Sequence, residues 1–250
     1  MSIEEVKKIN NAWEEWFHAI YDPGDLPSYW HYRPFSNEYW NEKNKIVLCN
    51  EEPYGDSEER CYLELDKYKN WLEEGIRTAK FSAVFLYSLY KQLHNISITE
   101  KQLRELYHNN NELLNGIRNT TYMNLRKTEK WKAGTKEDKD SIIRSLVHDK
   151  KYDERDKDGE CNKFNRKLTL EFIDALEPNI FIITGVDIGL FVLKDIYTDK
   201  LNNLNSLQKY GMYKTENTLF VSMKHLSRID YNYILQKTGA IYDELQKQPN

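Results

Sequence analysis

Four short segments of the chain are rich in apolar or β-branched residues. They lie at 45–50, 120–125, 179–185 and 218–223, and each has polar residues at or directly after its end. Short apolar or β-branched runs of this kind are typical of strands that are buried on both faces of a parallel sheet. We therefore predict four strands over these ranges.

The stretches between these segments carry apolar residues at helical spacing. In 3–20 they include Val6, Ile9 and Trp13, and Thr99 with Gln102 forms a capping-box pattern where another helix begins. Alternation of strands and helices is typical of layered α/β folds. The pattern predicts an α/β fold, a three-layer α/β/α arrangement around a central, mainly parallel four-stranded sheet, with helices at 3–20, 66–94, 99–111, 164–176, 188–196 and 230–246.

The length favours one domain rather than two. At 250 residues the chain can build one large α/β core. We predict a single domain over 1–250, with an aromatic N-terminal extension at 1–44 and a helical insertion at about 66–115.

Composition excludes some classes of function. The net charge of −4 argues against a protein that coats DNA regardless of sequence, although the basic residues at 126–136 and 224–228 could still form a local basic groove. The three cysteines lack the paired spacing of a zinc site or an iron–sulfur cluster. We expect reduced thiols, no cofactor and no metal. Since no charged-then-apolar leader or membrane-length apolar run is seen, we expect a soluble cytoplasmic monomer with no membrane partner.

The residues that follow the first predicted strand are suited to chemistry. Glu51 and Glu52 come directly after the apolar run, and Pro53 and Tyr54 follow them. Proline restricts its own backbone and biases the preceding residue toward an extended conformation. The carboxylate of Glu52 is therefore expected to be held at a strand tip, which is where open α/β sheets bind ligands.

The other predicted strands also end in polar side chains. Asn124 ends the second strand, Thr184 and Gly185 end the third, and His225, Ser227 and Arg228 follow the fourth. If the strands are parallel and adjacent, these residues meet at one rim. The set combines a carboxylate, an amide that can read a donor–acceptor edge, a histidine and a hydroxyl–guanidinium pair suited to phosphate.

The order of these motifs resembles the uracil-DNA glycosylase superfamily. Its first motif has the form Gly-Gln-Asp-Pro-Tyr-His or Gly-Glu-Ala-Pro-Gly, and this chain has Asn50-Glu51-Glu52-Pro53-Tyr54-Gly55. Its last motif, His-Pro-Ser followed by a wedge residue, is similar to His225-Leu226-Ser227-Arg228-Ile229. The segments Tyr122–Leu125 and Glu177–Gly185 resemble the strands between them, so the resemblance covers roughly 45–235.

The resemblance implies a DNA glycosylase of base-excision repair, and with it a role for each residue. Glu52 would activate water and stabilise positive charge on the sugar, and His225 would donate to the departing base. The base would be bound by Asn124, which reads its edge, and by Tyr54, which limits what fits beside it, with Glu51 adding charge nearby. Ser227 would hold phosphate, as the chemistry of the Ser227–Arg228 pair also suggests, and Ile229 would be inserted into the duplex as an apolar wedge.

Purely structural roles are also open to several of these residues. Glu51 and Glu52 could begin a solvated loop, His225 could cap a helix, and Ser227 could be the N-cap of the helix that begins near Asp230. At the level of function, the alternatives are a non-catalytic nucleic-acid or nucleotide-binding module with the same fold, and a doubly wound hydrolase of small nucleotides or nucleosides.

Overall fold

The computed structural model describes residues 3–20, 30–50, 61–63, 65–124, 160–185 and 210–247. Its centre is a five-stranded sheet with the strand order β4-β2-β5-β7-β6. The first four of these strands are parallel, and β6 is antiparallel to its neighbour β7. The strands are β2 (Ile46–Asn50), β4 (Thr120–Asn124), β5 (Ile180–Thr184), β6 (Met212–Lys214) and β7 (Leu219–Met223).

The four predicted strands are confirmed to within one residue at each end. Every residue of β2, β5 and β7 is buried, as the continuous apolar runs require. The predicted strand count was wrong, because β6 adds a fifth strand. This edge strand has only three residues, which are half-buried and include Lys214, so it lacks the apolar run by which the other strands were found.

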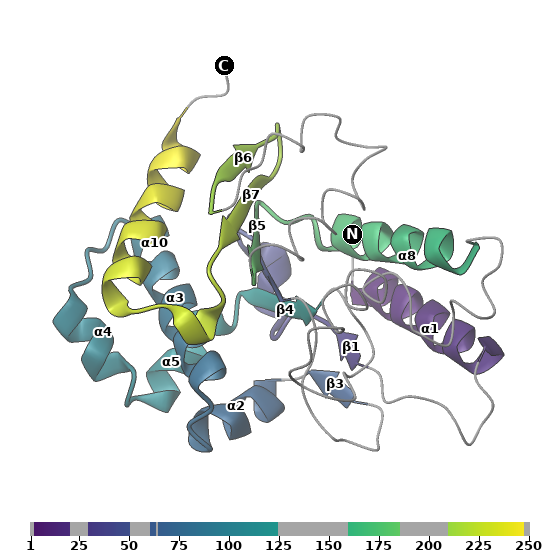
Figure 1. Ribbon diagram of the computed structural model, residues 1–250, viewed down its shortest axis with the longest axis horizontal. Helices are drawn as coiled ribbons and strands as arrows, with labels where there is room; N and C mark the ends of the chain where they lie inside the picture. The colour runs from purple at the N-terminus through teal and green to yellow at the C-terminus, as the bar shows by residue number, and fades with distance from the viewer. Residues whose placement is uncertain are drawn as a thin grey trace, which may run out of the picture.

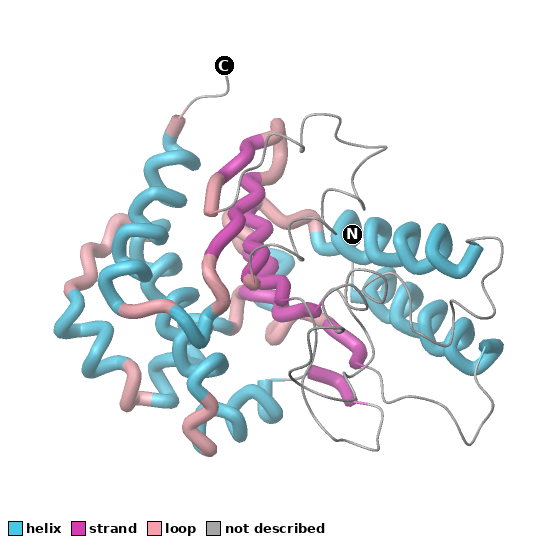
Figure 2. The backbone as a smooth tube through the Cα atoms, viewed as in Figure 1, coloured by secondary structure: helices cyan, strands magenta, loops and turns pink. Residues whose placement is uncertain are grey.

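Helices lie on both sides of the sheet, as the three-layer prediction requires (Figure 1). On one side α1 (Ile3–Ile20) packs against α8 (Glu160–Leu176), with the ring centroids of Trp13 and Phe172 5.7 Å apart. On the other side lie α3 (Arg77–Leu93) and α10 (Tyr231–Gln246). Their buried hydroxyls, those of Ser88 and Thr238, are 3.1 Å apart and hydrogen-bonded. The separation of the helices by the strands is also clear in Figure 2.

The segment that connects β2 to β4 contains more helices than the sequence predicted. A single helix over 66–94 was wrong, since α2 (Leu65–Glu73) and α3 are separated at Gly75, which has a φ of 74°. The predicted capping box of Thr99 and Gln102 is confirmed at the start of α4 (Glu100–Leu106). The asparagine run at 109–111 opens a further helix, α5 (Asn110–Ile117), because the Asn109 side chain accepts from the backbone N–H of Glu112. The predicted helix at 188–196 lies outside the described residues.

Two of these helices are packed tightly enough to make the connection part of the core. In α3, every residue from Ala79 to Leu89 is buried. Gly116 of α5 lies so close that a Cβ atom there would be 2.8 Å from Cβ of Tyr87 and 2.9 Å from its Cα. Since α3 joins β2 to β4 and covers the sheet, the predicted helical insertion supplies one of the layers.

The N-terminal segment is also packed into the core. Val6, Trp13, Tyr32 and Tyr39 are almost completely buried, and Asn10 donates through Nδ2 to the carbonyl of Tyr32 over 2.9 Å. A short strand, β1 (Trp30–Tyr32), pairs in parallel with β3 (Cys61–Leu63), and the 3-10 turn η1 (Asn37–Asn41) follows β1. Among the helices of the described residues, none has the length and apolar character needed to cross a bilayer.

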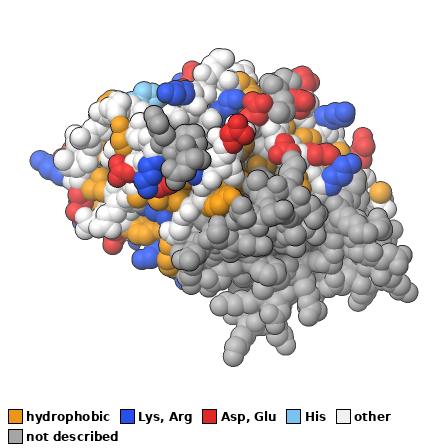
Figure 3. Space-filling view, turned by 90° about the horizontal axis from the view of Figure 1, so that it is seen from above, with side chains coloured by type: hydrophobic (Ala, Val, Ile, Leu, Met, Phe, Trp, Pro, Cys, Tyr) orange, Lys and Arg blue, Asp and Glu red, His pale blue; other side chains and the backbone are white. Residues whose placement is uncertain are grey.

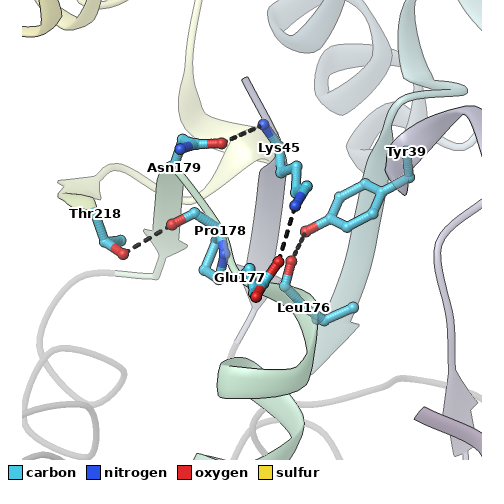
Figure 4. A network of polar contacts seen from close by, with 7 residues as sticks. All are labelled: Tyr39, Lys45, Leu176, Glu177, Pro178, Asn179 and Thr218. Carbon is cyan, nitrogen blue, oxygen red and sulfur yellow. Dashed lines mark hydrogen bonds and ion pairs between the residues drawn. The ribbon is translucent and has the colours of Figure 1, made fainter. Parts of the chain in front are cut away.

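Polar contacts join the amino ends of β2, β5 and β7 (Figure 4). The side chain of Asn179 accepts from the backbone N–H of Lys45 over 3.0 Å, and Lys45 Nζ pairs with Glu177 over 3.0 Å. Thr218 donates to the carbonyl of Pro178 over 2.8 Å, and the Tyr39 hydroxyl donates to the carbonyl of Leu176 over 2.9 Å. This network aligns the strands, and hence their opposite ends.

Candidate active site at the carboxyl edge of the sheet

The strand order places a topological switch point between β2 and β5. From β2 the chain moves outward to β4 through α3, and then returns across β2 to β5 through α8. The two connections leave the sheet on opposite faces, and such a reversal opens a crevice beyond the carboxyl ends of the two central strands. This is the position at which open α/β sheets bind ligands.

The carboxyl ends of the four parallel strands lie in one row. Asn50 at the end of β2 is in register with Asn124 at the end of β4, and Thr184 at the end of β5 is in register with Met223 at the end of β7. The same register pairs Cys49 with Ile183 between β2 and β5. The expectation that these strand tips share one rim is met for the backbone.

A buried hydrogen-bonded group crosses three strands at this rim. Asn50 is 5% exposed, donates through Nδ2 to the hydroxyl of Tyr122 and accepts through Oδ1 from the hydroxyl of Thr184. Burial raises the pKa of Tyr122, so its hydroxyl remains protonated at neutral pH. Both ends of the Asn50 amide are therefore held, and so is the point from which the chain continues into Glu51 and Glu52.

The fourth strand leads into a short turn that holds His225. This residue is the N-cap of η3 (Leu226–Arg228), and its Nδ1 accepts from the backbone N–H of Ser227 over 3.2 Å. The hydroxyl of Ser227 lies 2.8 Å from the same nitrogen. Since Nδ1 accepts, the proton of a neutral imidazole is on Nε2, which makes no hydrogen bond to the described residues.

The imidazole of His225 is kept neutral by its surroundings. Burial lowers its pKa, and the nearby positive charge of Arg228 lowers it further. A neutral imidazole that carries its proton on Nε2 is a hydrogen-bond donor without a net charge. It can stabilise a negative charge that develops on a bound group.

The residues that follow His225 only partly match the roles expected of them. The backbone N–H of Ser227 donates to Nδ1 of His225, and the Ser227 hydroxyl lies beside the same nitrogen. Arg228 is exposed, in agreement with a contact to a ligand. Ile229 is 2% exposed and belongs to the hydrophobic core, so the expectation that it projects as a wedge was wrong. The N-cap of α10 is Asp230, not Ser227, because its carboxylate accepts from the N–H of Tyr233.

The remaining expected site residues are only partly described. Glu51, Glu52 and Tyr54 lie outside the described residues. The backbone of Asn124 is placed at the rim by its pairing with Asn50. The grouping of the Glu52, Asn124 and His225 side chains around one cavity stays a prediction.

Sequence reasoning missed the central position of Asn50 and Tyr122. Asn50 appeared only as the residue before the two glutamates, and Tyr122 only as part of a strand. One signal was present, because a polar residue at the end of a fully apolar run has to be satisfied by neighbouring strands. Which strands supply its partners depends on the strand order.

Two cavities bordered by described residues lie away from this rim. One, of about 320 Å³, is at the amino end of the sheet and is bordered by Asn179, Thr218 and Lys214. The other, of about 500 Å³, lies among α3, α4 and α5, beside Tyr87 and Glu112. Within the described residues no group of three potential metal-binding side chains is found. Neither cavity combines a strand tip with a donor such as His225.

Compared with protein-family models and with curated proteins, the chain matches none.

Proposed function

We propose that this protein is a monofunctional, metal-independent DNA glycosylase with a uracil-DNA glycosylase-like fold. It would hydrolyse the N-glycosidic bond of uracil or another altered base. The observation that supports this most is the shared rim of β2 and β7. It brings Asn50, the residue that precedes the Glu51–Tyr54 motif, and the turn of His225 to the same edge of the sheet, beside the switch point.

The reaction would need two groups on opposite sides of the sugar–base bond. Glu52 accepts a proton from water as the water oxygen bonds to C1′, and its charge stabilises the oxocarbenium character of the sugar. The bond between C1′ and the base nitrogen breaks, and the base takes the electron pair. The Nε2–H of His225 donates a hydrogen bond to the base oxygen on which this charge develops.

Further residues would bind the substrate. The target nucleotide has to leave the base stack before Glu52 can reach its sugar. Asn124 would hydrogen-bond the base edge, while Tyr54 limits the space beside the base and Glu51 borders the same pocket. Ser227 would hold phosphate, and the exposed Arg228 would contact the DNA backbone beside it.

The test is a pair of identical substitutions at opposite edges of the sheet. Glu52→Gln keeps the shape of the side chain but removes its basicity, so release of uracil from a synthetic oligonucleotide should fall by about 10²–10⁴-fold. Glu177→Gln, at the amino edge, should release uracil at the wild-type rate. The product is an abasic site, cleaved by alkali and measured on a gel. Full activity of Glu52→Gln would show that the assigned mechanism is wrong.

The substrate range is tested in the same assay. Oligonucleotides with uracil, hypoxanthine, xanthine, and hydroxymethylated or glucosylated pyrimidines, in single and double strands, should give one preferred substrate. Release of bases from free nucleosides without affinity for DNA would instead favour a small-molecule hydrolase.

One observation favours a second candidate, a non-catalytic nucleic-acid-binding module. His225 and Ser227 satisfy each other within η3, so the turn has a structural reason for both residues. This candidate predicts binding of DNA with no abasic product from any of the substrates above. The gel assay separates it from the glycosylase.

A further inference from the structure

Two arginines from distant parts of the chain meet at the η3 turn. Arg77, the first residue of α3, donates through Nε to the carbonyl of Ser227 over 3.0 Å. Arg228 is the next residue along η3, and both arginines are exposed. Apart from this hydrogen bond, neither side chain has a hydrogen bond or an ion pair with the described residues. As far as the described residues are concerned, their remaining N–H donors are unbonded.

An aromatic cluster holds the nearby cations in place. The guanidinium of Arg77 lies 4.5 Å from the ring centroid of Phe81, and that of Arg104 lies 4.8 Å from the ring of Tyr231. The two rings are themselves in contact, with centroids 5.6 Å apart. Contacts of this kind restrict a long side chain before any ligand arrives, which reduces the entropy lost on binding.

The charge of this surface differs from that of the whole protein. Basic and acidic side chains are interspersed over the described surface seen in Figure 3, and the net charge of the chain is −4. Two acidic side chains among the described residues near these arginines have partners of their own. Glu100 pairs with Arg104, and the carboxylate of Asp230 caps α10. Within the described residues, no acidic side chain forms an ion pair with Arg77 or Arg228.

We infer that the basic surface formed by Arg77, Arg104 and Arg228 binds phosphates of the DNA strand that carries the target nucleotide. The inference rests on the proposed function and assigns it a substrate-binding surface. Guanidinium groups match the geometry of phosphate oxygens and form charge-assisted hydrogen bonds with them. Since the surface adjoins the turn of His225, a strand bound there would pass beside the proposed active site.

The surface also gives the connection between β2 and β4 a role in binding. Arg77 belongs to α3 and Arg104 to α4, which are far in the sequence from the η3 turn at 226–228. Arg77 joins the two regions through its bond to Ser227. Binding of phosphate would therefore involve helices that the motif sequence does not include.

The test measures the salt dependence of DNA binding. A fluorescently labelled single-stranded 20-mer without a lesion is titrated at salt concentrations from 50 to 200 mM with the wild type, Arg77→Gln, Arg228→Gln and the double variant. Each lost phosphate contact should reduce the slope of log K against log salt by about 0.7 for a single strand. The matched control is Arg118→Gln, an exposed arginine at the amino edge beside the start of β4.

The DNA-binding results test this inference independently of whether the protein releases bases. If the double variant and Arg118→Gln both bind with wild-type affinity and slope, the inference is wrong, whether or not the protein releases bases. If only the double variant loses affinity and slope, the inference stands even where no abasic product forms. Arg77→Gln could perturb the turn, because it removes the bond to Ser227. Arg228→Gln removes no hydrogen bond to the described residues, so its affinity and salt dependence then test the inference.

Discussion

The amino edge of the central sheet, where its parallel strands begin, and the carboxyl edge, where they end, both contain polar side chains. The contacts of these side chains differ. At the amino edge, Asn179 and Thr218 satisfy backbone groups of neighbouring segments, Lys45 N–H and the Pro178 carbonyl. At the carboxyl edge, Asn50 bonds to the side chains of Tyr122 and Thr184. The first arrangement holds the backbone together. The second holds one side chain directly before the proposed catalytic motif.

This difference predicts which property each edge controls. A side chain that satisfies a backbone group contributes to stability wherever it lies, and its loss leaves a polar group unpaired. A buried network of side chains at a strand tip also determines geometry, and small displacements there are costly to catalysis. Substitutions at the amino edge should therefore affect stability alone, and those at the carboxyl edge should affect activity as well.

Among the substitutions that compare the two edges, the largest effect is expected from Asn50→Leu. The substitution keeps the approximate volume but removes both hydrogen bonds, so the strand tip that leads to Glu52 is no longer held. Base release should fall by on the order of 10²-fold, with a loss of about 1–3 kcal/mol in the free energy of unfolding. Single-turnover base release and urea unfolding measure the two effects.

Two companions sharpen this prediction. Thr184→Val and Tyr122→Phe each remove one of the two contacts to Asn50, so each should have a smaller effect on base release than Asn50→Leu. If Asn50→Leu is less stable but fully active, the claim that the carboxyl edge controls activity as well as stability is wrong.

An intermediate effect is expected from Asn179→Ala. The backbone N–H of Lys45 loses its acceptor, which should cost about 1–3 kcal/mol in the free energy of unfolding, while the rate of base release at a temperature where the protein is folded stays unchanged. Asn217→Ala, an exposed position in the neighbouring turn, is the matched control and should leave the unfolding curve unchanged. A reduced rate of base release in Asn179→Ala would contradict the prediction.

The smallest effect, on the pH dependence of stability, is expected from a substitution of His225 and is confined to acidic pH. Burial and Arg228 lower the pKa of His225 in the folded protein below its unfolded value near 6.5. Below that pH the unfolded chain binds a proton that the folded protein binds less readily, so stability is full above about pH 6.5 and falls as the pH decreases. In His225→Asn, the loss of stability between pH 7.5 and 5.5 should therefore be smaller than in the wild type.

Unfolding in urea at the two pH values tests this, with His94→Asn as the control. His94 is exposed at the end of α3, far along the chain from η3. An unchanged pH dependence in His225→Asn would show that His225 is not the group responsible.

Local patterns in the sequence determined most of the elements. The buried strands were predicted because short apolar runs are typical of strands buried on both faces. The start of α4 was predicted because Thr99 and Gln102 satisfy its first backbone groups. The break at Gly75 was missed because apolar residues recur on both sides of it. The start of α5 at Asn109 was missed because an asparagine run can end a helix as well as begin one.

The sequence by itself also determined that polar residues follow each strand, and hence that a site could form at one edge. Only the tertiary structure decided which residues meet there. Strand order makes Asn50 a neighbour of both Tyr122 and Thr184, and packing buries Ile229 while it brings Arg77 to Ser227. Local sequence encodes the period of each element, but the adjacency of elements arises from burying all their apolar faces at once.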